Sequence, residues 1–252
     1  MREIIFVSIA AFVAWFVDAV AGGWGLIQIP ALFIAYPNTL PALLLGTNKI
    51  PSFFGTSLAA YNFVKRQKID WQHVGVWMIT CALCAIGGSY LVSVINPEVV
   101  KPIILVMLIV IAVYTYATKN LWAMESLKHT GRKHLWMGVF LAAVMGFYDG
   151  FLWPWTGNLL VMGFITIIWF DFLKASTHAK LLNLSSNFWS ILLFGSTGLV
   201  RWALVIPMAI CNLLGSWLGT HMAFLKWNTF IRKIFIWAIS LAILRYAWDI
   251  FL

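Results

Sequence analysis

Four charged residues lie inside otherwise apolar stretches of this chain, and their spacing repeats. The separation between Asp18 and Lys49 along the sequence is the same as that between Asp149 and Lys180. A charge inside a membrane is costly unless it is paired or hydrated, so such residues mark substrate and proton pathways. The lysines are suited to neutralising an anion. The aspartates are suited either to carrying protons or to forming static salt bridges, and the spacing leaves both roles open.

Polar residues accompany both lysines. Thr47 and Asn48 directly precede Lys49, which lies well inside an apolar run. Snorkelling of this lysine to the membrane surface is the alternative to a functional role. Near the second lysine, helical spacing predicts a polar stripe on one face, made of Lys180, Asn183 and Asn187. Such a stripe indicates either a polar cavity or hydrogen bonds between helices, and the lysine within it favours the cavity.

Each aspartate is followed by a stretch that glycine or proline interrupts. The first stretch, 18–30, contains Gly22, Gly23 and Gly25, and the second, 146–158, contains Thr156, Gly157 and Asn158. Glycines permit an unwound turn, and the N-terminus of the helix that restarts after it favours an anion through its free N–H groups. A helix kink or close small-residue packing is the alternative.

Other reactive side chains give weaker signals. His178 is able to titrate near neutral pH, although a lone histidine more often serves packing. Cys81, Cys84 and Cys211 are an odd number of thiols inside apolar runs, which does not indicate a disulfide framework. The spacing of the first two matches a redox motif, so a membrane-embedded thiol enzyme is an alternative, but packing is favoured. We find no metal-ligand spacing and no nucleophile–base arrangement, and we expect no metal, no cofactor and no catalysis.

The composition indicates that these residues lie within a membrane. The chain has 252 residues, of which 62% are hydrophobic and 10% charged, and its mean hydropathy is +0.90. A soluble domain has about 25% charged residues, so an ordinary soluble enzyme, a disordered chain and a nucleic-acid binder are excluded despite a net charge of +9. We therefore predict an all-α polytopic bundle with eight to ten membrane segments. The ten apolar runs lie at 3–20, 24–36, 42–63, 73–94, 101–118, 134–150, 155–170, 174–195, 202–224 and 233–251.

The two halves of the chain are related by one constant shift along the sequence. This shift places Asp18 on Asp149 and Lys49 on Lys180 without a gap. We predict a first transmembrane repeat at 1–118, a cytoplasmic linker at 119–133 and a second repeat at 134–252.

The basic loops predict how the two repeats are oriented. Cytoplasmic loops carry the excess of Lys and Arg, which assigns 64–70, 119–134 and 225–233 to the cytoplasm and the sparsely charged 95–101 and 195–201 to the outside. Equivalent loops then face opposite sides, so the repeats are inverted, and each has an odd number of crossings. Five crossings satisfy this, and so do three crossings plus a re-entrant pair made of the first two segments.

The motifs together resemble the sulfite exporter TauE/SafE family, also called 4-toluene sulfonate uptake permeases. The matching motifs are Asp18–Pro30, Gly46-Thr47-Asn48-Lys49, Gly146–Gly150 with Thr156-Gly157, and Lys174–Asn187. The resemblance covers nearly the whole chain. Trp24, Trp153 and Trp155 stand where the family pattern has glycine, which predicts a narrowed pocket, an aromatic gate or loss of the ancestral transport role.

The resemblance implies a permease of the bacterial inner membrane. Its expected partners are a small sulfur-containing anion, such as sulfite or an organosulfonate, and the lipid bilayer. Proton coupling and homo-oligomer formation are left open, and an anion channel is an alternative. We expect the site near the midplane between the halves, as in other transporters with inverted repeats.

Overall fold

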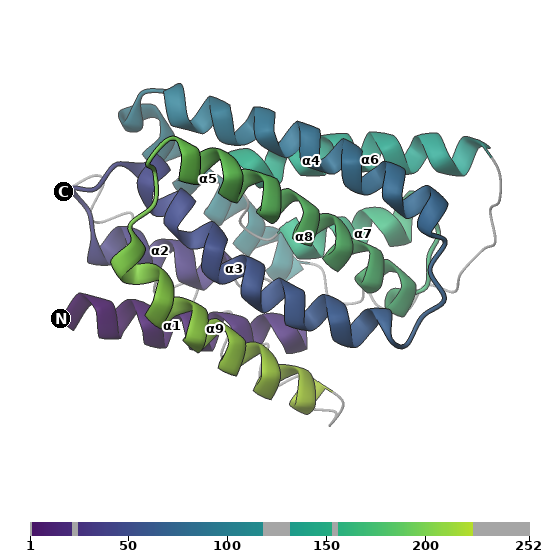
Figure 1. Cartoon of the computed structure of the whole chain (residues 1–252), viewed down its shortest axis with the longest axis horizontal. Coiled ribbons are helices and arrows are strands. Elements are labelled where there is room, and N and C mark those ends of the chain that lie inside the picture. Colours follow the sequence, from purple (N-terminus) through teal and green to yellow (C-terminus); the bar gives the residue numbers. More distant parts are fainter. Residues whose placement is uncertain (1, 22–24, 118–131, 153–155, 224–252) are drawn as a thin grey trace.

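The described part of the chain is built from α-helices and short connections. The computed structural model describes residues 2–21, 25–117, 132–152 and 156–223, and within these ranges no strand occurs. The helices, shown in Figure 1, are α1 (Arg2–Ala21), α2 (Gly25–Ala35), α3 (Pro41–Val64), α4 (Trp71–Val94), α5 (Pro97–Ala117), α6 (Arg132–Phe151), α7 (Thr156–Thr166), α8 (Phe172–Ser196) and α9 (Trp202–Ala223). The prediction of an all-α fold is confirmed.

Three helices of the described residues are long and apolar enough to cross a membrane. They cover Trp71–Val94, His134–Phe151 and Trp202–Gly219. By contrast, α2 and α7 have 11 residues each, which gives about 16 Å of helix, roughly half of the hydrocarbon thickness. The predicted segment 155–170 extends beyond the helix that the structure has. The helix α7 stops at Thr166, and the chain turns at Trp169, whose φ is 62°.

Local sequence explains where the longer helices begin. Pro41 occupies the first turn of α3, where its missing N–H would have no partner in any case. Asp70 caps α4 by accepting from the Gln72 N–H, and Asp171 caps α8 by accepting from the Lys174 N–H. A hydrogen bond from the His73 ring also lowers the pKa of the Asp70 carboxyl. These caps fix the start of the helices that follow the α3–α4 and α7–α8 connections.

Helices from the two halves of the sequence pack side by side. α4 packs along α6, and α1 packs along α9, while α3 lies against both α8 and α9. In Figure 1, α4 and α6 begin at the right-hand end of the bundle, whereas α1 and α9 begin at the left-hand end. The α1–α9 and α4–α6 pairs therefore run in opposite directions.

Small residues allow the α4–α6 pair to come into backbone contact. A Cβ atom on Gly146 would meet the backbone of Cys81, and a Cβ atom on Gly150 would meet the backbone of Ala85. The corresponding contact in the other pair is Gly215 of α9 against the backbone of Phe12 and Phe16 of α1. Small residues commonly permit such close approach between helices in membranes.

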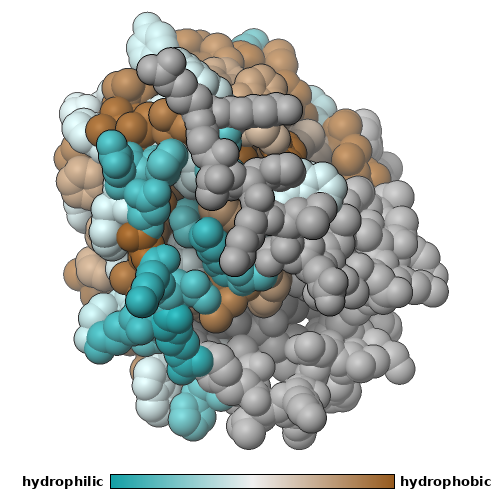
Figure 2. Space-filling view, turned by 90° about the vertical axis from the view of Figure 1, so that its right-hand side faces the viewer, coloured by the Kyte–Doolittle hydropathy of each residue, from teal (hydrophilic) through white to brown (hydrophobic). Residues whose placement is uncertain are grey.

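The right-hand end of the bundle in Figure 1 carries exposed charged residues. Figure 2 looks at this end and shows hydrophilic residues gathered there, with hydrophobic ones beside them. The α3–α4 connection contributes the exposed residues Lys65, Arg66, Lys68 and Asp70. This is the first of the loops that the sequence assigns to the cytoplasm.

Candidate functional site

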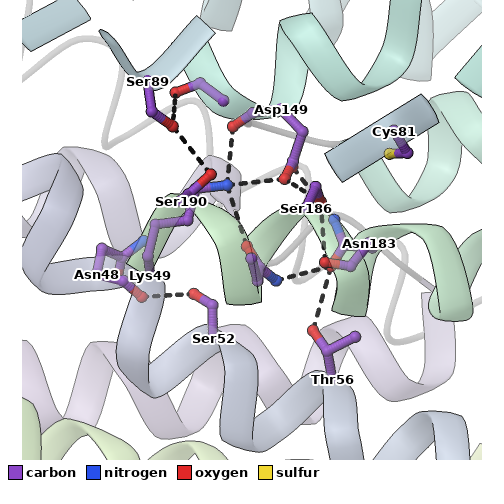
Figure 3. A network of polar contacts seen from close by, with 12 residues as sticks. Asn48, Lys49, Ser52, Thr56, Cys81, Ser89, Asp149, Asn183, Ser186 and Ser190 are labelled. Atoms are coloured by element: carbon purple, nitrogen blue, oxygen red, sulfur yellow. Dashed lines mark hydrogen bonds and ion pairs between the residues drawn. The ribbon is translucent and has the colours of Figure 1, made fainter. Parts of the chain in front are cut away.

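Lys49 of α3 and Asp149 of α6 form a salt bridge that is fully buried. The distance from Nζ to Oδ2 is 2.7 Å, and neither side chain has any exposed surface (Figure 3). The Lys49 ammonium also donates to the backbone oxygen of Asp149 at 2.8 Å and to Oδ1 of Asn187 at 3.0 Å. An ammonium has three N–H donors, so these three acceptors match its full donor capacity.

The Asp149 carboxylate is held by α8 as well as by α3. Its Oδ2 accepts from Oγ of Ser186 at 2.6 Å, and its Oδ1 accepts from Nδ2 of Asn183 at 3.2 Å. Asn183 Oδ1 in turn accepts from Thr56 Oγ1 of α3 at 3.2 Å and from Asn187 Nδ2 at 3.1 Å. The polar stripe of α8 thus forms interhelical hydrogen bonds. Asn183 and Asn187 bind the Lys49–Asp149 ion pair and not Lys180.

The second pair, Lys180 with Asp18, is looser. Its Nζ–Oδ2 distance is 3.8 Å, and the two side chains are 19% and 9% exposed. The Lys180 ammonium also lies 5.3 Å from the centre of the Phe63 ring, a cation–π distance. Each ion pair joins one half of the sequence to the other, so the lysine and the aspartate of the same half do not pair with each other.

A family model described as sulfite exporter TauE/SafE matches residues 7–246. The chain belongs to the TauE/SafE family. A probable membrane transporter protein of Sinorhizobium, ORF9, is 33% identical over 239 residues, which cover 94% of this chain and 90% of that protein. A probable membrane transporter protein of Haemophilus influenzae is 33% identical, covering 88% and 85% of the two chains. The probable transporter YfcA of Escherichia coli K12 is 31% identical, covering 90% and 82%. No match to a solved structure was found.

In this TauE/SafE transporter, the two predicted residues that precede Lys49 have different surroundings from each other. Thr47 Oγ1 accepts from the Arg201 N–H at 2.8 Å and donates to the Leu43 carbonyl, so it ties α3 to the α8–α9 connection. Asn48 is fully buried, and within the described part of the chain neither of its polar side-chain atoms has a hydrogen-bond partner. Both the N–H donors and the oxygen acceptor of the predicted residue Asn48 are therefore available to a ligand.

The two interrupted stretches are described only in part. Gly25 begins α2, Thr156 begins α7, and Gly157 and Asn158 follow in the first turn of α7. Thr156 is buried, and a Cβ atom on Gly157 would meet nothing within 4 Å. Gly22 and Gly23, and the substituted tryptophans Trp24, Trp153 and Trp155, lie outside the described residues.

His178 is surrounded by aromatic rings instead of the ion pairs. Its ring centre lies 4.8 Å from that of Phe170, 5.6 Å from that of Phe164 and 6.0 Å from that of Trp77. Its Nδ1 lies 2.6 Å from the Lys174 carbonyl oxygen. This environment favours the packing role of His178 over proton coupling.

The three cysteines are free thiols. Cys81 is buried, and its Sγ lies 3.6 Å from the Leu182 carbonyl oxygen of α8. Cys84 and Cys211 are partly buried. The Cys81 environment agrees with a packing role.

Several buried polar residues were missed at the sequence level. They are Gln28, Thr56, Ser89, Ser186, Ser190 and Asn212. Ser186 lies on the same face as Asn183, so the stripe on α8 contained a signal for it. Ser89 donates to Ser190 at 2.9 Å or to the Gly150 carbonyl at 3.2 Å, and no spacing rule links residues so far apart in the chain.

Proposed function

We propose that this TauE/SafE transporter is a secondary permease of the bacterial inner membrane for a small sulfur-containing anion, such as sulfite or an organosulfonate. The observation that carries the proposal is the pair of intramembrane Lys–Asp bridges that cross between the two halves. Charges inside a membrane are rare and serve transport pathways. The transporter names of the relatives agree with this function and do not define the cargo.

The proposed architecture is a pair of inverted repeats with re-entrant first hairpins. The starts of α2, α3 and α4 at residues 25, 41 and 71 recur, with the same intervals between them, as the starts of α7, α8 and α9 at 156, 172 and 202. The opposite directions of the α1–α9 and α4–α6 pairs support inversion (Figure 1). The short α2 and α7 support three full crossings plus a re-entrant pair in each half, since neither helix alone is long enough to span the bilayer.

In this proposal the two lysines have different tasks. Lys180 receives the anion, because its bridge is longer and its side chain is partly accessible. Lys49 keeps α3 closed against α6 and α8, because Asp149 and Asn187 already accept hydrogen bonds from it. The first turns of α2 and α7, with Gly25, Thr156, Gly157 and Asn158, add backbone N–H groups for the anion.

Proton coupling follows from charge balance at the looser bridge. An anion that takes the place of Asp18 beside Lys180 leaves a carboxylate without its cation in a low-dielectric site. Uptake of one proton by Asp18 removes that charge. The anion and the proton then bind together, and their release regenerates the Lys180–Asp18 bridge.

Sulfite-driven pH change in proteoliposomes tests this function. We expect proton movement that follows an imposed sulfite gradient. Replacing Lys180 with methionine should reduce the rate by about tenfold to a hundredfold, the equivalent of losing a charged hydrogen bond of about 1.5–3 kcal/mol.

Lys174→Met is the matched control for this experiment. Lys174 belongs to the same helix, and its ammonium lies 4.2 Å from the centre of the Phe170 ring. We expect this variant to keep most of the parent rate. Equal rates for the parent and Lys180→Met would contradict the anion role of Lys180, and the absence of any sulfite flux in the parent would contradict the proposed cargo.

The tryptophan substitutions give a separate prediction about selectivity. Glycine at positions 24, 153 and 155 restores the family pattern and removes three large rings from the interrupted stretches. We expect faster flux of bulky organosulfonates relative to sulfite, measured by competition in the same vesicles. Unchanged rates and unchanged selectivity would rule out both a narrowed pocket and an aromatic gate.

A further inference from the structure

Three fully buried carboxamides have no hydrogen-bond partner among the residues that the structure describes. They are Gln28 of α2, Asn48 of α3 and Asn212 of α9, each with no exposed surface. Neither the nitrogen nor the oxygen of any of these side chains is hydrogen-bonded. A buried polar group without a partner costs free energy, and native proteins leave few of them. These six atoms are therefore available to hydrogen-bond a molecule that the protein encloses.

Asn48 lies about 100° around α3 from Lys49, so the two side chains do not share one face of the helix. It lies seven residues before Gly55, so the two residues share one face of α3. A Cβ atom on Gly55 would meet the Trp15 ring of α1, and the Gly55 carbonyl accepts from Ser216 of α9 at 3.2 Å. The Asn48 amide is thus directed toward the region where α3 meets α1 and α9.

Asn212 belongs to the same region. It precedes Ser216 by four residues, which places both on the α9 face that contacts α3. The chain just before α9 is bound to α3 where the Arg201 N–H meets Thr47, and Ser216 contacts Gly55 further along. Asn212 lies between these two contacts, so it is level with the turn of α3 that follows Asn48.

Gln28 reaches the same depth from the other arm of a helical hairpin. α2 and α3 are joined by residues 36–40, and α2 packs on both α1 and α3. Gln28 precedes Tyr36 by eight residues, and Asn48 follows Leu40 by eight residues. Both therefore lie about 12 Å below the connection.

We propose that Gln28, Asn48 and Asn212 form a hydrogen-bonding site for the oxygens of the transported oxyanion. This inference rests on the proposed function and names the groups that recognise its cargo. Each carboxamide offers two N–H donors and one acceptor, so the three accommodate several sulfur-bound oxygens and one acid proton. The carboxamides are neutral donors that recognise the positions of the oxygens. This site is separate from Lys180, whose ammonium lies beside Phe63, fifteen residues beyond Asn48 and so about 22 Å further along α3. A halide lacks separate acceptor atoms and fits this site less well.

Apolar replacements of similar size separate a ligand site from a structural role. Asn48→Leu and Asn212→Leu remove amides that have no partner among the described residues, so the melting temperature without ligand should stay equal or rise. The matched control is Asn183→Leu, which breaks bonds to Asp149 and Thr56 and should lower the melting temperature. If Asn212→Leu lowers the melting temperature as much as Asn183→Leu does, the proposal is overturned.

Ligand measurements on the same purified variants complete the test. The sulfite concentration that half-saturates transport should rise about tenfold for Asn212→Leu and for Gln28→Leu, a change equivalent to about 1.4 kcal/mol. The melting-temperature increase caused by sulfite or methanesulfonate should shrink in parallel, while bromide should cause little increase in any variant. Unchanged half-saturation in all three amide variants would overturn the proposal. The measurements without ligand need no cargo, so they decide the inference separately from the identity of the substrate.

Discussion

Replacing Lys49 with methionine will unfold or strongly destabilise this protein, and adding Asp149→Asn will recover most of the loss. The single substitution leaves a fully buried carboxylate without its cation, which typically costs about 3–5 kcal/mol. The double variant removes both charges and keeps an oxygen at position 149 to accept from Ser186 and Asn183. Melting temperature and the monodisperse yield in detergent measure both effects.

Lys180→Met is the matched comparison for Lys49. Its bridge to Asp18 is longer and partly exposed, so the substitution should lower the melting temperature much less while it still reduces transport. If Lys49→Met is as stable as Lys180→Met, the buried bridge does not hold the fold. If Asp149→Asn fails to improve the stability of Lys49→Met, the loss arises from packing instead of charge.

Two adjacent glycines of α4 will respond very differently to alanine. A Cβ atom at Gly88 would meet the Phe147 carbonyl and would come within 2.7 Å of the Phe151 nitrogen, whereas at Gly87 its nearest contact is a Phe147 ring atom at 3.9 Å. Backbone atoms have no alternative rotamer, so Gly88→Ala must push α4 and α6 apart. Overpacking costs about 1–3 kcal/mol and occasionally more.

Thermal unfolding of the two variants in detergent tests this prediction. We expect a melting temperature about 10 °C lower for Gly88→Ala, taking about 3 kcal/mol and about 2–4 °C per kcal/mol. Gly87→Ala should equal or exceed the parent, because alanine favours the helix over glycine. Similar melting temperatures for the two variants would mean that α4 and α6 separate without cost.

The sequence was sufficient to predict the described helices, apart from the end of α7, and the important charges, but not how the charges pair. The predicted segment 233–251 lies outside the described residues. Apolar runs and Pro or Asp at helix starts indicate the boundaries of α3, α4 and α8. The equal spacing of Asp18–Lys49 and Asp149–Lys180 singled out the four charges. The pairing is set by helix packing across the two halves, which brings Lys49 to Asp149 over 100 residues of sequence, and no local pattern encodes that contact.

The isolated amides were the least predictable part of the site. Gln28 and Asn212 each stand alone in an apolar run, where a single amide usually forms a hydrogen bond between helices. Only the folded protein shows that neither forms such a bond with a described residue. Asn183 has the same side-chain chemistry as Asn212, but Asp149 and Thr56 lie within its reach.

The backbone contacts within the α1–α9 and α4–α6 pairs determine which parts are able to move separately. Helices that touch through glycine resist sliding, so each pair will behave as one rigid body containing a helix from each half of the sequence. The Lys49–Asp149 bridge connects α3 to the α4–α6 body, and the Lys180–Asp18 bridge connects α8 to the α1–α9 body. Ser186 of α8 also donates to Asp149 of α6, and Ser216 of α9 donates to Gly55 of α3. Each of the helices α3 and α8 is therefore bonded to both bodies. A motion of one half of the sequence against the other would have to separate α1 from α9 and α4 from α6 and so break the glycine contacts, whereas a motion between the two bodies would leave those contacts intact.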